Sequence, residues 1–141
     1  MRLKHILPLL LITVAFTACV EKTETTGDSQ TTVAPDFSID REDLESKILT
    51  IIPAEDILIS SGQTKKSGEE AYNFISVEIV SPDSSPSSGI TFSSLANEVA
   101  KTVEEDISNI KDFQKVMVEV HDSVEEENSE YTITYKKELE L

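Results

Sequence analysis

The 141-residue chain has one cysteine, no tryptophan and only four glycines. A single thiol excludes an internal disulfide framework. Without tryptophan, the hydrophobic core has to be built from Ile, Val and Leu, with a few Phe and Tyr. With so few glycines, no glycine-rich loop of the kind that binds phosphate groups is present.

Positive charge is also scarce, because 12 Lys and Arg stand against 27 Asp and Glu, a formal net charge of −15. A field of this sign repels phosphate backbones, so we expect no nucleic-acid partner. The preferred interpretation of the acidic residues is a solvated surface. Attraction to a basic partner or to divalent cations is the alternative.

The first 18 residues have the organisation of an export signal. A basic start with Arg2 and Lys4 precedes an apolar run over residues 6–16. The run is shorter than the roughly 20 apolar residues that span a bilayer, and it suits the apolar region of a signal peptide. It leads into Phe16-Thr17-Ala18-Cys19, which resembles the lipobox of bacterial lipoproteins. Phe16 departs from the Leu that is usual there.

The resemblance covers residues 1–19 and implies a lipid on the sulfur of Cys19, with cleavage of residues 1–18 as a lipoprotein signal peptide. Loss of Arg2 and Lys4 would take the net charge from −15 to −17. Two or three acyl chains hold a protein at a membrane far more firmly than one chain does. We therefore expect a membrane partner through the lipid anchor, and no cofactor besides this covalent lipid.

Residues just after Cys19 bear on the location. In the family, Asp directly after the cysteine often means retention in the inner membrane, and this chain has Val20 instead. We therefore expect a cell-envelope lipoprotein of the outer membrane. Glu21 and Glu24 resemble acidic signals for display on the cell surface, and the periplasmic side is the alternative. Residues 19–38 are polar and predict a flexible tether, followed by an acidic domain over residues 39–141.

The first half of the domain predicts a helix and a hairpin. Asp40 suits an N-cap and Pro53 ends the apolar pattern, which predicts a helix over residues 41–51. Alternating residues predict strands over residues 56–65 and 71–80. In the second strand Ile75, Val77 and Ile79 share one face, and Tyr72, Phe74, Ser76 and Glu78 share the other.

The second half predicts a long helix and another hairpin. Ser93 or Ser94 is the expected N-cap of the helix, which runs to about residue 110 and has an apolar stripe at helical spacing. Strands follow around residues 116–120 and 131–135, joined by an acidic loop over residues 122–130. The fold class is therefore α+β, in the order α-β-β-α-β-β. The long helix links the second and third strands, so these two strands should be parallel if both lie in one sheet. We expect a four-stranded, mostly antiparallel sheet with the long amphipathic helix packed on its Ile/Val face.

The other face of the sheet is the candidate partner patch. Tyr72 and Phe74 are expected to share it with Met117, His121 and Thr132. If the helix over residues 41–51 covers this face, these residues are core, which is the preferred interpretation. If it does not, they form an exposed aromatic patch suited to a partner.

No motif names a reaction, and we predict no catalytic residue and no metal ligand. After cleavage His121 is the only histidine, and no Gly-x-Ser-x-Gly elbow is present. The first hypothesis is a non-catalytic binding or structural module of the envelope. The alternatives are a small envelope hydrolase or its accessory subunit, with His121 or an acidic cluster such as Glu104 in a pocket, and an acidic inhibitor or immunity protein for a basic partner.

Overall fold

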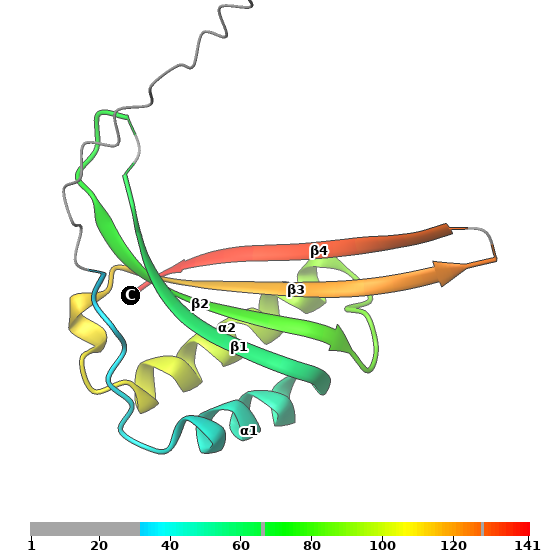
Figure 1. Cartoon of the computed structure of the whole chain (residues 1–141), viewed down its shortest axis with the longest axis horizontal. Coiled ribbons are helices and arrows are strands. Elements are labelled where there is room, and N and C mark those ends of the chain that lie inside the picture. The colour runs from blue at the N-terminus through cyan, green and yellow to red at the C-terminus, as the bar shows by residue number, and fades with distance from the viewer. Residues whose placement is uncertain (1–31, 66, 128) are drawn as a thin grey trace, which may run out of the picture.

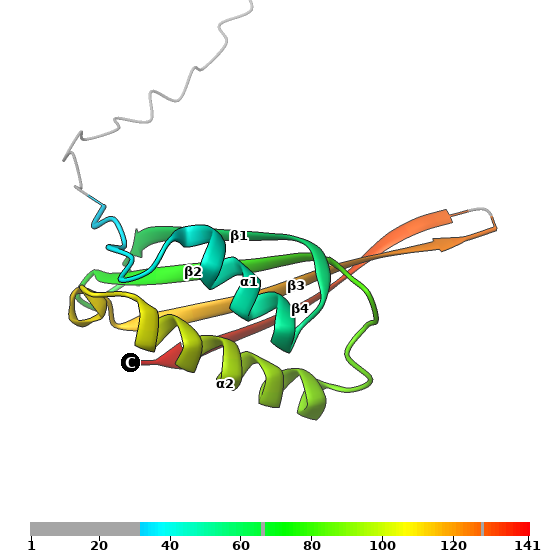
Figure 2. The ribbon, with the colours of Figure 1, turned by 90° about the horizontal axis from the view of Figure 1, so that it is seen from below.

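The computed structural model describes residues 32–65, 67–127 and 129–141. The predicted signal peptide, Cys19 and most of the predicted tether lie outside these residues. The elements follow the predicted order: α1 (Arg41–Ile51), β1 (Ala54–Thr64), β2 (Tyr72–Pro82), α2 (Gly89–Asp106), a 3₁₀ turn (Ile110–Asp112), β3 (Lys115–Glu126) and β4 (Ser129–Glu140). One four-stranded sheet carries both helices on the same side (Figure 1; Figure 2). The predicted fold class is confirmed.

The strand order in the sheet is the order in the chain, β1-β2-β3-β4. The two hairpins β1–β2 and β3–β4 are antiparallel. The central pair β2–β3 is parallel, because the helical crossover through α2 returns the chain to the end of the sheet where β2 began. This parallel pair was predicted from the helix between the two strands.

The hydrophobic core lies between the sheet and the helices. Alternate residues of each strand face it, since side chains in a strand point to opposite sides in turn. The fully buried positions are Ile75, Val77 and Ile79 on β2, Val116, Val118 and Val120 on β3, and Leu44, Ile48, Val99 and Val103 on the helices. The Ile/Val face of the prediction is therefore the core face. We call the opposite side, which neither α1 nor α2 covers, the open face.

Helix α1 has the predicted bounds but covers the other side of the sheet from the one we preferred. Leu44 and Ile48 bury against the Ile/Val core beside α2, and Lys47 pairs with Asp106 of α2 at 2.6 Å. The prediction that this helix buries Tyr72 and Phe74 is wrong. The Ile/Val face is wide enough for two helices, and burying the apolar side of α1 there leaves the more polar face in water.

The N-cap of helix α2 lies five or six residues before the predicted one, and the helix ends about four residues earlier than predicted. Ser88 is the N-cap, and its Oγ accepts a hydrogen bond from the backbone N–H of Thr91. The earlier start places Phe92 inside the helix, where it is buried. The helix ends at Asp106, and the predicted last turn is a separate 3₁₀ turn that brings Phe113 into the core.

Residues 32–38, predicted as tether, are attached to the domain. Ser61 Oγ on β1 donates to the carbonyl of Val33 at 2.7 Å. The backbone N–H groups of Ser38 and Ser108 donate to Asp106 and Asp36, at 2.9 and 2.7 Å. Val33 and Phe37 pack on the core. The folded part of the chain therefore begins before the predicted boundary, because two apolar side chains within the polar stretch reach the core.

Candidate functional site

The β3–β4 hairpin projects beyond the rest of the sheet (Figure 1). Pairing of β2 with β3 ends at Val80 and His121. Pairing of β3 with β4 continues from Asp122 opposite Ile133 to Glu126 opposite Ser129. We call this two-stranded projection, residues 122–133, the arm. It replaces the predicted acidic loop over residues 122–130, which was wrong: charges in a ribbon with water on both sides carry little desolvation cost, and the ladder continues through them.

The two sides of the arm differ in chemistry. Val124, Tyr131 and Ile133 lie on the side that continues the core face, together with Asp122 and Ser129. On the opposite side every residue is polar. Among the described residues, the hydrophobic side chains that pack on the core reach along β4 only as far as Tyr135. Residues 122–135 contain five acidic residues and no Lys or Arg. The arm is therefore an acidic ribbon with apolar side chains that lie beyond the core.

The open face holds the four residues of the predicted partner patch. Tyr72 and Phe74 are half-buried, Met117 is 9% exposed, and His121 is partly buried. The Phe74 ring lies over Gly62 of β1, its directly paired neighbour. The predicted sharing of one face by these residues is confirmed. They are neither core under a helix nor a broad exposed patch, because long neighbouring side chains cover them.

Ion pairs make up much of this cover. Lys115 Nζ lies 2.9 Å from Glu140, 3.5 Å from Glu138 and 4.9 Å from the centroid of the Tyr72 ring. The hydrogen bond to Glu140 is the main reason that the pKa of Lys115 is raised above its ordinary value of 10.5. The acidic strand β4 thus holds a lysine against an aromatic ring of β2 across the edge of the open face.

A second cluster surrounds Glu119. Its carboxylate lies 2.6 Å from Lys136 Nζ and 3.5 Å from His121 Nε2, and the hydrogen bond to Glu119 raises the pKa of Lys136. His121 Nδ1 lies 3.3 Å from Thr134 Oγ1. The imidazole is thus held between a carboxylate and a hydroxyl. His121 does not line the cavity described below.

One contact that the sequence analysis missed resembles a Ser–Lys catalytic pair. Lys137 Nζ lies 2.5 Å from Ser93 Oγ, 3.3 Å from the Ser93 carbonyl oxygen and 2.8 Å from Asn97 Oδ1. A general base needs a free lone pair, which only a neutral lysine has. Three acceptors around Nζ match the three hydrogens of a charged ammonium instead. The contact therefore joins β4 to α2, and its chemistry is structural.

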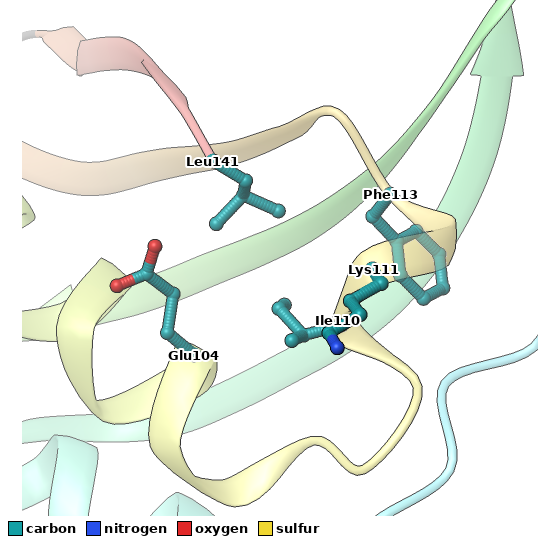
Figure 3. Close-up of a pocket in the computed structure, with 5 residues that line it drawn as sticks. All are labelled: Glu104, Ile110, Lys111, Phe113 and Leu141. Atoms are coloured by element: carbon teal, nitrogen blue, oxygen red, sulfur yellow. The ribbon is translucent and has the colours of Figure 1, made fainter.

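A cavity of about 320 Å³ lies at the other end of α2, lined by Glu104, Ile110, Lys111, Phe113 and Leu141 (Figure 3). Glu104 belongs to the helix layer, whereas His121 belongs to the open face. The two residues of the hydrolase hypothesis are thus on opposite sides of the sheet. One carboxylate and one lysine on an apolar wall provide no nucleophile with its base.

Within the described residues, no three His, Cys, Asp or Glu side chains come together in a way that could hold a metal ion. Neither helix in this part of the chain combines the length and the apolar character needed to cross a membrane.

Comparisons with protein families, curated proteins and solved structures find no match to this chain. The arm is consequently the feature of the structure from which a function can best be argued.

Proposed function

We propose that this protein is a lipid-anchored module of the bacterial cell envelope that binds another protein chain through its arm and carries out no catalysis. The anchor is Cys19, supported by the signal-like residues 1–18 and by the resemblance to a lipobox. The outer membrane is the proposed location, supported by Val20 in place of Asp.

The arm is the observation that carries the binding role. A two-stranded ribbon is at best marginally stable by itself in water. The arm nevertheless holds Val124, Tyr131 and Ile133 along one side, beyond the point where the core ends. Apolar side chains that lie beyond the core are explained by a partner that covers them.

The positions of the arm and of the N-terminal attachment support the same role. Residues 32–38 bind to Ser61 and to Ser108, at the end of the sheet opposite the arm (Figure 1; Figure 2). A chain anchored through its N-terminal segment would thus carry the arm at its far end. Net negative charge would keep the domain off anionic headgroups.

The anchor is tested by fractionating cells that express Cys19→Ser. Because the lipid alone would hold the membrane, the variant should move from the membrane to the soluble fraction, with an unchanged circular dichroism spectrum. Thr23→Ser, a mild change in the same segment, should stay with the membrane. A Cys19→Ser chain that remains in the membrane fraction would refute the anchor.

The binding role is tested by replacing residues 122–133 with a short Gly-Asn-Gly-Ser loop. His121 and Thr134 face each other in the register, so a short loop can join the two strands where the arm begins. The free energy of unfolding should change by less than about 1 kcal/mol, as for a surface change. Chemical cross-links between this protein and other chains in whole cells should disappear. Cross-links that persist in a folded, truncated chain would contradict the role of the arm.

A further inference from the structure

The two outer strands of the sheet, β1 and β4, differ at their free edges. Along β1, the Arg41 guanidinium donates to the carbonyl of Ile59 at 3.0 Å, and the backbone N–H of Ile57 donates to the side chain of Asp56 at 2.9 Å. Such side chains occupy backbone groups that another strand would need. Within residues 32–65, 67–127 and 129–141, no strand pairs with the outer edge of β4.

The sequence of β4 next to this edge is self-complementary. It reads Glu130-Tyr131-Thr132-Ile133-Thr134-Tyr135-Lys136, which is the same in both directions around Ile133 except for the charges at its ends. We propose that a second copy of this chain adds its β4 to this edge, antiparallel, across a two-fold axis at Ile133. This inference rests on the proposed role of the arm and names its partner.

Antiparallel pairing at this register gives each residue of the segment 130–136 a suitable partner on the second copy. Ile133 faces its own copy, Thr132 faces Thr134, Tyr131 faces Tyr135, and Glu130 faces Lys136 twice. β-branched, aromatic and opposite-charge pairs are the ones that stabilise neighbouring strands. Glu130 and Lys136 both lie on the open face, so their side chains would meet on one side of the joined sheet.

Neighbouring registers give less favourable charge pairs. A two-fold axis perpendicular to the sheet has to pass through a residue, because directly opposed side chains must point to the same side. Moving the axis by one residue along β4 therefore shifts the pairing by two residues. Centring the axis on Thr134 would place Glu130 opposite Glu138. Centring it on Thr132 would place Glu130 opposite Thr134 and lose the pairs with Lys136. The charges thus select Ile133 as the centre.

An exposed apolar side chain on α2 is further evidence for an added strand. Ile90 is 86% exposed in the first turn of α2. It precedes Ser93 and Asn97 by three and seven residues, which places it on the same side of the helix. That side lies along β4, since Lys137 bonds to both Ser93 and Asn97. A second copy would bring its own Tyr131 beside Tyr135, next to this side of α2, where Ile90 can be covered.

The expected dimer is weak in solution and stronger on a membrane. An edge between two strands is smaller than the roughly 800 Å² per partner of stable complexes, and two strongly acidic domains repel each other. Anchoring both copies to one bilayer raises their effective concentration, in the way that a linker of suitable length does. Both N-terminal segments would leave from the outer ends of the dimer, where the tethers can reach the same membrane.

Cysteine cross-linking of the full chain in whole cells tests the register. Across the two-fold axis the Cα atoms at position 133 would lie about 4.5–5.5 Å apart, within the range that a disulfide bridges. Ile133→Cys should give a disulfide-linked dimer under mild oxidation. Thr132→Cys is the matched control, because its two copies would lie about 8 Å apart, too far for a disulfide. The wild-type chain is a second control, because any disulfide dimer that it forms must come from Cys19 without a lipid.

Charge exchange in the Ile133→Cys background tests the partner. Glu130→Lys alone or Lys136→Glu alone would place like charges opposite each other twice and reduce the disulfide dimer on the order of tenfold. Coexpression of these two variants with different tags should restore it as a mixed dimer, in which each Lys meets a Glu. Because the mixture restores what each variant loses, loss of folding cannot explain the result.

Three outcomes would overturn the inference: equal dimer from Ile133→Cys and Thr132→Cys, no dimer from either, or no recovery in the mixture. A photoreactive side chain at position 133 that cross-links to a protein of another mass would assign the edge to a different partner and leave the proposed function standing. Failure of Cys19→Ser to leave the membrane would instead refute the anchor and leave the dimer unaffected.

Discussion

The ring of Phe74 lies directly over Gly62 on the neighbouring strand, so that a β-carbon added to Gly62 would collide with the far end of the ring. Gly62 therefore makes room for an aromatic side chain that covers the open face. We expect Gly62→Val to force the ring away and to lower the free energy of unfolding by about 1–2 kcal/mol, in the range for overpacking. Urea denaturation followed by circular dichroism measures this change.

The matched control is the same substitution in a Phe74→Ala background. Without the ring, Val has space and favours a strand more than Gly does. Gly62→Val should then be neutral or stabilising. Equal destabilisation in both backgrounds would show that the ring is not what requires glycine at this position.

The contact between Lys137 and Asn97 gives a second prediction, which separates a structural role from a catalytic one. Lys137→Met keeps most of the aliphatic length of the side chain and removes the ammonium that joins β4 to α2. We expect a loss of about 1–3 kcal/mol, the range for hydrogen bonds to charged groups. A double-mutant cycle with Asn97→Ala measures their coupling, and a coupling near zero would contradict the contact.

Much of the fold follows from local patterns. Asp40 before and Pro53 after an apolar pattern placed α1 correctly, although the Asp40 side chain makes no capping hydrogen bond. Alternation placed Ile75 and Val77 on the core face, and the helix between β2 and β3 predicted their parallel pairing. These features depend on neighbours in sequence or on simple connection rules.

The errors share a different cause, which is that two local choices were about equally good and tertiary packing decided between them. Ser88, Ser93 and Ser94 are all acceptable caps, and burial of Phe92 selects Ser88. Either side of the sheet could receive α1, and the wider apolar face does. Acidic residues predict a loop on charge alone, whereas strand pairing across Val124 and Tyr131 continues through them.

Part of the candidate site was also readable in advance. Alternation along β4 places Lys137 between Tyr135 and Leu139 on the core side, and a lysine at a core position calls for a partner. Its partners on α2, Ser93 and Asn97, lie 44 and 40 residues away in the sequence and could not be named from spacing. The symmetry of the sequence around Ile133 was visible, but its meaning depends on β4 being an outer strand.

The ion pair between Lys47 and Asp106 gives a third prediction. Asp106 has a side chain only 10% exposed, at the end of α2, and the 2.6 Å contact with Lys47 joins the two helices. Lys47→Met would leave this carboxylate without its cation. Because Lys47 itself is largely exposed, we expect a loss of about 1–2 kcal/mol, between the values for surface and buried pairs.

Asp106→Asn is the informative companion to Lys47→Met. In the Lys47→Met background, Asp106→Asn removes the unpaired charge and should recover part of the lost stability. Thermal unfolding of the four chains measures the recovery. Additive losses in the double variant would mean that the two side chains do not interact across the helices.

The last prediction concerns alkaline pH and Lys115. Its pKa is raised above 10.5 mainly by the hydrogen bond to Glu140, so the folded state binds the proton more tightly than the unfolded state does. Stability from this pairing is therefore complete below pH 10.5 and is lost as the pH rises through the higher folded pKa. We expect the stability of the wild type to fall more steeply above pH 10.5 than that of Lys115→Met. Glu140→Gln should flatten the profile in the same way.

Lys101→Met, whose ammonium lies 3.9 Å from Glu105 on an exposed helix surface, serves as the control and should keep the wild-type slope. Parallel profiles for the wild type and Lys115→Met in urea titrations from pH 9 to about 12 would show that the pairing adds nothing to stability.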